Sequence, residues 1–313
     1  MVHQYINNGY HIVLDVNSGA IHVVDEVVYD VIPLFEKHSS EEITGLLREK
    51  YSEEEIREAV EEVAQLKKEG SLFTPDTYEA PLIDFKKRPT VVKALCLHIA
   101  HDCNLACRYC FAEEGEYHGR RALMSYETGK AALDFLIANS GSRRNLEVDF
   151  FGGEPLMNFE VVKQLVAYGR EQEKLHDKHF RFTLTTNGVL LNDDIMEFAN
   201  REMDNVVLSI DGRKEVHDHM RPFRKGAGSY DLIVPKFQKF AKSRNQEKYY
   251  VRGTYTHFNT DFSKDVLHLA DLGFKQISVE PVVAEETDDY AIKEEDLPVL
   301  FKEYDDLAAE MVR

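Results

Sequence analysis

From about residue 91 to its end, the chain alternates between two patterns of apolar positions. Short runs of apolar and β-branched residues predict buried strands, and stretches with apolar residues every three or four positions predict helices packed on them. Six such strand–helix units predict an α/β fold, a parallel sheet curled into a partial (β/α)6 TIM-like barrel. The predicted strands span residues 94–99, 146–151, 181–186, 205–210, 249–255 and 276–280. The predicted helices span residues 125–138, 160–175, 190–201, 230–243 and 264–272, with a last helix after about residue 291.

The first 75 residues follow a different pattern and predict a small unit of their own. β-branched runs at residues 10–14 and 21–24 flank a turn-rich segment containing Asn17 and Gly19, which is typical of a β-hairpin. Three helices are predicted after it, at residues 26–37, 39–50 and from 52 to about 70, and the last two begin with capping signatures. A free edge of this sheet would suit an extended peptide that adds as a strand, and a structural cap on the larger domain is the alternative.

Prolines mark the boundary between the two parts. Pro75, Pro81 and Pro89 stand among polar residues, so we divide the chain into residues 1–75, a linker at 76–92 and a larger domain at 93–313. The helical periodicity that begins near residue 294 reaches the last residue without a Gly, Asn or Pro stop signal. We therefore expect the chain to be the N-terminal piece of a longer protein.

Charge and composition narrow the class of protein. A net charge of −18 at pH 7 argues against binding to nucleic acid or to an anionic membrane, because both require clustered positive charge. No apolar run is long enough to span a membrane, and the N-terminus lacks a basic-then-apolar signal pattern, so a cytoplasmic location is expected. Four cysteines with three on one short segment do not form a disulfide framework.

The three clustered cysteines are the strongest chemical signal. Cys103, Cys107 and Cys110 follow a predicted strand at C-x3-C-x2-C spacing. Thiolates are the preferred ligands of iron–sulfur clusters, and three of them on a four-iron cluster leave one iron open for a small molecule. A structural zinc site is the alternative, although it needs a fourth ligand, for example His98 or His101. Cys96 lies within a strand and is expected to be a small buried apolar residue.

Polar groups and glycines follow the other predicted strands, at the edge where ligands bind in such folds. Gly153 would let the backbone approach a ligand, Glu154 suits an ammonium group and Arg252 suits a carboxylate. Ser209 and Asp211 suit ribose hydroxyls, and the apolar edge at Val279 suits an adenine ring. S-adenosylmethionine presents all of these groups on one molecule, and its amino and carboxylate groups can chelate an open iron.

These motifs resemble those of the radical S-adenosylmethionine (radical SAM) enzymes. The cysteine loop is similar to their C-x3-C-x-aromatic-C signature, with Tyr109 as the aromatic residue, and segments 150–155, 185–188 and 209–212 resemble their glycine–glycine–glutamate, third-strand and ribose motifs. The resemblance covers residues 90–313 and implies that the three cysteines ligate a 4Fe–4S cluster. It also implies contacts to the methionine or ribose part of S-adenosylmethionine from Gly153, Glu154, Asn187, Ser209 and Arg252, with Tyr109 and Phe111 near the adenine.

Further resemblance points to a subgroup that modifies peptides. Residues 217–230 look like those of radical SAM enzymes that carry a C-terminal SPASM or twitch domain, and residues 1–75 resemble the winged-helix-like element that binds a leader peptide along a sheet edge. Together these segments resemble the thioether maturases of SCIFF peptides (six cysteines in forty-five residues). The implied partners are a precursor peptide, with its leader bound to residues 1–75, and an electron donor such as flavodoxin or ferredoxin. Auxiliary 4Fe–4S clusters are expected only if a C-terminal domain exists beyond residue 313, because no cysteine follows Cys110.

Two other functions remain open at this point. Within the same enzyme class, the chain could oxidise a cysteine or serine side chain as anaerobic sulfatase-maturating enzymes do, although these do not generally use an N-terminal peptide element. In a different class, it could be a non-catalytic, zinc-bearing, peptide-binding protein.

Overall fold

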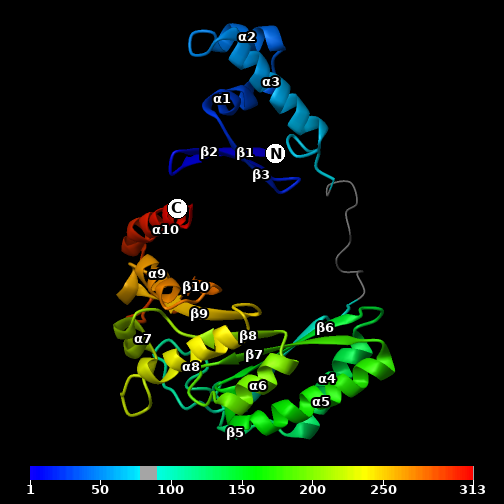
Figure 1. Ribbon diagram of the computed structural model, residues 1–313, viewed down its shortest axis with the longest axis vertical. Coiled ribbons are helices and arrows are strands. Elements are labelled where there is room, and N and C mark those ends of the chain that lie inside the picture. Colours follow the sequence, from blue (N-terminus) through cyan, green and yellow to red (C-terminus); the bar gives the residue numbers. More distant parts are fainter. Residues whose placement is uncertain (78–89, 313) are drawn as a thin grey trace. The chain divides into compact units, whose positions relative to one another are not determined.

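The computed structural model describes residues 1–77 and 90–312 (Figure 1). The chain divides into two compact units, one that takes in Met1–Arg88 and Ala309–Arg313, and a larger one at Pro89–Ala308. Each unit has its own buried apolar core. Most of the predicted linker at 76–92 lies outside the described residues. Within the described ranges, no helix combines the length and the apolar content needed to cross a bilayer.

The first unit contains a three-stranded antiparallel sheet in the order β1 (Val2–Asn7), β2 (Tyr10–Asp15) and β3 (Ala20–Val24). β2 and β3 are the predicted hairpin. β1 was not predicted from the sequence, because polar side chains interrupt its apolar positions. The sequence does carry a signal for this strand, because the pair Asn8 and Gly9 favours a two-residue turn between antiparallel strands. In the structure both residues have the positive φ angles that such a turn requires, 49° and 81°.

Three helices form the core of the first unit with this sheet: α1 (Glu26–Phe35), α2 (Ser40–Leu47) and α3 (Glu53–Lys68). Ser39 with Glu42, and Ser52 with Glu55, form the capping boxes that begin α2 and α3. The core residues include Val13, Val31, Ile43, Ile56 and Val63, each at most 1% exposed.

The second unit is built on a seven-stranded sheet in the order β10-β9-β8-β7-β6-β4-β5. Six strands are parallel and the short edge strand β5 is antiparallel to β4. Because the parallel strands follow one another in both chain and sheet, the sheet winds in one direction as in a barrel, which confirms the predicted partial (β/α)6 TIM-like fold. The strands are β4 (Ala94–His101), β5 (Ala122–Leu123), β6 (Asn145–Gly152), β7 (His179–Thr186), β8 (Asn205–Ser209), β9 (Tyr249–Tyr255) and β10 (Ile277–Pro281).

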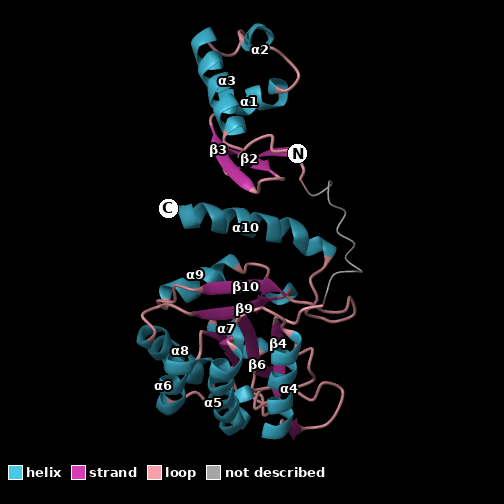
Figure 2. Cartoon of the chain, turned by 90° about the vertical axis from the view of Figure 1, so that its right-hand side faces the viewer, coloured by secondary structure: helices cyan, strands magenta, loops and turns pink. Residues whose placement is uncertain are grey.

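Helices connect these strands, and α4, α5, α6 and α8 gather on one side of the sheet (Figures 1 and 2). α7 was not predicted from the sequence; the other helices lie where the periodicity placed them. The helices are α4 (Tyr126–Asn139), α5 (Phe159–His176), α6 (Asp193–Glu202), α7 (Lys214–Met220), α8 (Tyr230–Ser243), α9 (Ser263–Asp271) and α10 (Leu297–Val312), with short 3-10 turns at Pro155–Asn158, His257–Asn259 and Glu294–Asp296.

The two faces of this sheet differ in chemistry because successive side chains of a strand point to opposite sides. One face supplies the main core, including Ile99, Phe150 and Leu208, all fully buried. We call the opposite face, which carries many polar residues, the inner face. Cys96 lies on it and is exposed, so the prediction of a buried apolar cysteine was wrong. The reason is the alternation along β4, in which Leu97 and Ile99 point into the core and Cys96 points away from it.

Candidate active site

The cysteine loop follows the carboxyl end of β4 and is held by backbone hydrogen bonds to a segment distant in sequence. The amide of Ala106 donates to the carbonyl of Pro222, and the amide of Arg108 donates to the carbonyl of Met220, both at 2.9 Å. This pairing fixes the part of the loop between the first and last cysteine against the end of α7.

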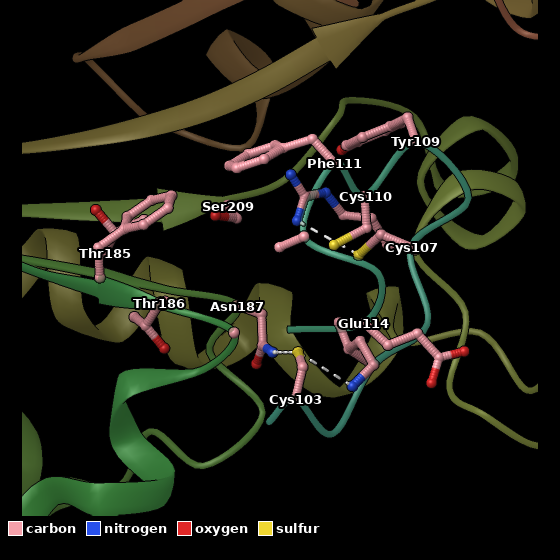
Figure 3. Close-up of a pocket in the computed structure, with 16 residues that line it drawn as sticks. Cys103, Cys107, Tyr109, Cys110, Phe111, Glu114, Thr185, Thr186, Asn187 and Ser209 are labelled. Carbon is pink, nitrogen blue, oxygen red and sulfur yellow. Dashed lines mark hydrogen bonds between the residues drawn. The ribbon is translucent and has the colours of Figure 1, made fainter. Parts of the chain in front are cut away.

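The three thiols of this loop line one cavity (Figure 3). Cys103, Cys107 and Cys110 are all free thiols. Burial raises the pKa of Cys103 to about 12 and that of Cys107 to about 11. In the protein alone these two thiols are therefore neutral at pH 7, and a cationic centre is required for them to ionise.

The rest of the cavity comes from the carboxyl ends of three neighbouring strands, as predicted for this fold. Gly153 follows β6, Asn187 follows β7 and Ser209 ends β8, and all three line the cavity. Tyr109 and Phe111 from the cysteine loop also line it. The lining residues that were not singled out from the sequence include Leu105, Glu114, Phe151, Thr185, Thr186 and Arg221.

Gly153 is required by the close packing of two loops. Its amide donates to the carbonyl of Ala100 at 2.8 Å, and the next amide, of Glu154, donates to the carbonyl of Asp102 at 2.9 Å. A Cβ atom at Gly153 would lie 2.2 Å from the carbonyl oxygen of Asp102. Only glycine lets the loop after β6 pack directly on the loop that carries the cysteines.

Glu154 is fully buried and does not line the cavity; its carboxylate instead holds the end of β7. One oxygen accepts from the hydroxyl of Thr186 at 2.8 Å and from the amide of Leu156 at 3.0 Å, and the other accepts from the amide of Asn187 at 2.8 Å. Burial raises the pKa of Glu154 to about 7, while these three donors stabilise the ionised form.

Asn187 connects this network to the first cysteine. Its side-chain amide donates to Oδ1 of Asn104 at 2.8 Å and lies 3.5 Å from Sγ of Cys103 (Figure 3). Thr186, the last residue of β7, therefore contacts Glu154, and Asn187, the residue after it, contacts Cys103 of the cysteine loop.

A buried ion pair supports the opposite wall. Nε of Arg221 donates to Oδ1 of Asp211 at 3.0 Å, and both oxygens of Asp211 accept from the hydroxyl of Tyr109 at 2.8 Å. The Arg221 guanidinium lies over the ring of Tyr109 and 3.9 Å from Sγ of Cys107, and its charge lowers the pKa of that thiol. Asp211 is fully buried and holds Tyr109 and Arg221 in place, so it does not face the cavity.

Two predicted contact residues lie away from this cavity. The guanidinium of Arg252 pairs with the carboxylate of Glu280 and is about half exposed. Val279 packs against a small apolar cluster with Tyr255 and Phe262. Neither lines the cavity, and Arg221 provides the cationic group there.

The donor set fits a thiolate-bound cluster better than a single metal ion. Within the described part of the chain, no three His, Cys, Asp or Glu side chains are grouped so that they could hold one ion. A cubane cluster sets a different requirement, because each of its thiolate ligands binds a different iron atom. Three free thiols spread around one cavity, with a cation needed to ionise Cys103 and Cys107, match that requirement.

The fold and the cavity define a partial α/β barrel with three free thiols at the carboxyl ends of its strands, and sequence comparison identifies the family. The model of the radical SAM superfamily matches residues 97–272, more than half of the chain. The chain belongs to the radical SAM superfamily, whose members use a 4Fe–4S cluster and S-adenosylmethionine.

Curated relatives are similar to part of the chain. An uncharacterised protein of Methanocaldococcus jannaschii is 31% identical over 60% of this chain and 62% of its own length. The radical SAM cyclopropyl synthase TigE of Paramaledivibacter caminithermalis is 23% identical over 54% of this chain and 38% of its own. A cysteine-type anaerobic sulfatase-maturating enzyme of Clostridium novyi is 28% identical over 42% and 36%. The chain thus spans less than two thirds of the length of each.

Solved structures share the fold. The enzyme anSMEcpe with bound AdoMet and Cp18Cys peptide superimposes with a TM-score of 0.60 at 20% identity, covering 70% of this chain and 59% of that one. SuiB of Streptococcus suis, bound to S-adenosylmethionine, gives a TM-score of 0.52 at 17% identity and covers 99% of this chain and 69% of that one.

Proposed function

We propose that the protein reductively cleaves S-adenosylmethionine to a 5′-deoxyadenosyl radical and uses it to modify a ribosomally made precursor peptide, forming thioether cross-links from cysteine. The observation that carries the radical chemistry is the cavity in which Cys103, Cys107 and Cys110 meet the ends of β6, β7 and β8. A bound 4Fe–4S cluster would supply the electron for the cleavage.

The chain's own residues would bind and orient the groups in this cavity. Cys103, Cys107 and Cys110 would hold the cluster. The positive charge of Arg221 would favour the thiolate form of Cys107 and attract the carboxylate of S-adenosylmethionine. We assign the carboxylate contact to Arg221 in place of Arg252, because only Arg221 lines the cavity. Asn187 and Ser209 would offer polar contacts.

Three further contacts follow from the predicted roles. Phe111, with 70% of its surface exposed at the cavity, would provide an apolar surface for adenine. Gly153 would allow close approach of the backbone, and Glu154 would act through Asn187, whose amide it binds. Tyr109 and Asp211 would hold Arg221 in place.

The peptide part of the proposal concerns the first unit. β3 is an edge strand of the antiparallel sheet, so among the described residues one side of its backbone pairs with no other strand and would accept an added one. Its exposed side chains Ile21 and Val23 would contact such a strand. The complex of anSMEcpe with a peptide supports a peptide substrate for this fold. We propose that a leader peptide binds here, and that a flavodoxin or ferredoxin supplies electrons.

Anaerobic reconstitution with iron and sulfide tests the radical chemistry. The reconstituted, dithionite-reduced protein is expected to release 5′-deoxyadenosine from S-adenosylmethionine. The variant Cys107→Ala should lose this activity, and Cys96→Ala is the matched control because that thiol lies outside the cavity. A protein that stays colourless, or a Cys107→Ala variant with full activity, would contradict the proposal.

Deletion of residues 1–75 tests the leader site. The second unit has its own core, so the deletion should leave release of 5′-deoxyadenosine in the absence of peptide intact while weakening the binding of a precursor peptide encoded near the gene. Unchanged peptide affinity would make the first unit a structural cap.

Oxidation of a cysteine or serine side chain is the second candidate, favoured by the similarity to the sulfatase-maturating enzyme. Mass spectrometry of the peptide product separates the two. A thioether joins two residues of the peptide with loss of two hydrogens and resists reduction and alkylation, whereas side-chain oxidation leaves no link between residues.

A further inference from the structure

The inner face of the sheet carries buried polar atoms that the proposed cavity does not use. In the described ranges, four buried side-chain polar atoms have no hydrogen-bond partner. Three of them lie on or over the inner face: the hydroxyl of Tyr117, Oδ1 of Asp149 and Oδ1 of Asn205. Buried polar atoms are nearly always paired in native proteins, so three on one face mark hydrogen-bonding capacity that the protein itself does not use.

Strand register brings two of these residues into one row. Asp149 of β6 pairs with Thr183 of β7, and Thr183 pairs with Asn205 of β8. Two residues further along the same strands, and on the same face, Phe151 and Thr185 line the cavity. Because a strand rises about 3.3 Å per residue, the row lies about 7 Å along the sheet from those two residues. It is therefore next to the place where the proposed radical would form.

Tyr117 covers the β4 side of this row. Its ring packs at a tilt of 31° against that of His98, with 4.3 Å between the ring centroids. His98 lies on the inner face two residues after Cys96, the residue that pairs with Asp149, and Tyr117 also interacts electrostatically with Cys96. Burial raises the pKa of Tyr117 to about 12, so the hydroxyl keeps its proton at neutral pH.

The unpaired acceptors at the row favour a cationic ligand. Burial raises the pKa of Asp149, and Arg252 partly offsets this effect. Arg252 bonds to Glu280, and Oδ1 of Asp149 has no partner. A carboxylate oxygen and an amide oxygen are acceptors, and each is best completed by an N–H donor with positive charge.

We propose that Asp149 and Asn205 form a subsite for an ammonium or guanidinium side chain, a lysine or arginine of the substrate peptide, with Tyr117 covering it. This inference rests on the proposed function, because it assumes a peptide substrate. An anionic side chain would be repelled by Asp149, and an apolar one would leave both acceptors unpaired. The peptide residues that neighbour this lysine or arginine would then face the cavity at Phe151 and Thr185.

Cys96 provides a reporter for this subsite. It pairs with Asp149 in the register of β4 and β6, and its thiol is exposed. In the reconstituted protein, Cys96 is labelled with one of two thiol reagents. Aminoethyl methanethiosulfonate is cationic, and sulfonatoethyl methanethiosulfonate is anionic. Labelling at Cys96 is followed by peptide mass spectrometry, and each rate is divided by the rate of the same reagent with free cysteine.

The wild-type protein is expected to favour the cationic over the anionic reagent by about tenfold, which is the effect of one nearby charge at intermediate dielectric. Asp149→Asn should remove most of this preference. Glu147→Gln is the matched control: Glu147 lies on the same strand and face, but it is already paired with Lys93 at 3.1 Å. The synthetic peptide acetyl-GGKGG-amide should slow the labelling, and the same peptide with norleucine in place of lysine should not.

Equal normalised rates for the two reagents in the wild-type protein would overturn the proposal, as would equal protection by the lysine and norleucine peptides. Neither result depends on a variant, so misfolding of Asp149→Asn does not affect the test. An unchanged preference in a folded Asp149→Asn protein would also overturn it. Release of 5′-deoxyadenosine is measured on the same preparation. Its absence would refute the proposed function, whereas the labelling rates alone decide whether the cationic subsite exists.

Discussion

Replacing Arg221 by methionine tests how a buried charge supports the candidate active site. The side chain of Arg221 is 13% exposed, and its partner Asp211 is fully buried. Besides this ion pair, Asp211 accepts from the hydroxyl of Tyr109 and from the amide of Thr254 at 3.1 Å. In Arg221→Met, two neutral donors remain, and the carboxylate has lost its counterion.

The expected cost follows from that uncompensated charge. Removing one partner of a buried ion pair destabilises a protein by about 3–5 kcal/mol. Asp211→Asn should cost a similar amount, because it leaves the guanidinium of Arg221 buried without its carboxylate. The double variant removes both charges, so its cost should fall short of the sum of the two single costs by about 2–3 kcal/mol.

Urea unfolding followed by circular dichroism measures the total effect, since the chain contains no tryptophan for fluorescence. The two units have separate cores and need not unfold together, so hydrogen exchange of the amides in β8 and β9 should localise the effect to the second unit. Arg108→Met is the control, because Arg108 is exposed, and it should change stability by less than about 0.5 kcal/mol.

Strict additivity of the two single variants would refute the reasoning, because it would mean that Arg221 and Asp211 do not stabilise each other. A second consequence concerns the thiol that lies 3.9 Å away. Loss of the Arg221 charge should raise the pKa of Cys107 further, so Arg221→Met should incorporate less iron than the wild-type protein during reconstitution at pH 7.

Three more predictions concern the packing and protonation of the same unit. Gly153→Ala places a Cβ 2.2 Å from the carbonyl oxygen of Asp102 and should abolish release of 5′-deoxyadenosine, whereas Gly45→Ala, with open space around it, should not; an active Gly153→Ala enzyme would contradict the close approach. Glu154 has a folded-state pKa of about 7 against an unfolded value of 4.5, so its contribution to the stability of the apoprotein should fall by about 3 kcal/mol as pH rises from 4.5 to above 7. Glu154→Gln should therefore lose most stability relative to wild type at pH 5 and less at pH 8, and a difference independent of pH would refute this. Phe182→Ala removes a fully buried ring and should cost about 3–5 kcal/mol by urea unfolding; a cost below 1 kcal/mol would show that the core at this position repacks.

Much of the fold could be predicted from apolar periodicity because buried strands and amphipathic helices have different periods. The predicted bounds of β9 (Tyr249–Tyr255) and α8 (Tyr230–Ser243) coincide with those of the structure. β1 and α7 were missed, because β1 mixes polar and apolar residues and α7 has only seven residues. Short elements depend on tertiary contacts more than on their own pattern.

The site could be predicted where its residues directly follow strands. Gly153, Asn187 and Ser209 reach the cavity because the sheet brings the strand ends together. Arg221 was missed as a cavity residue because its position depends on the packing of α7 against the cysteine loop, although its segment had marked the enzyme subgroup. Arg252 lies on the expected strand, yet the sequence alone could not show that its side chain pairs with Glu280.

The cavity and the row at Asp149 arise from different features of the chain, and this difference bears on how such a protein acquires its own substrate. The cavity is built largely from backbone contacts between loops, such as the bond from the Gly153 amide to Ala100, so it tolerates few changes. The row consists of side chains on the inner face, outside the main core, where a substitution leaves the packing of the helices intact. A substitution at Asp149 or Asn205 is therefore expected to change the proposed substrate preference while the packing of the cavity is kept.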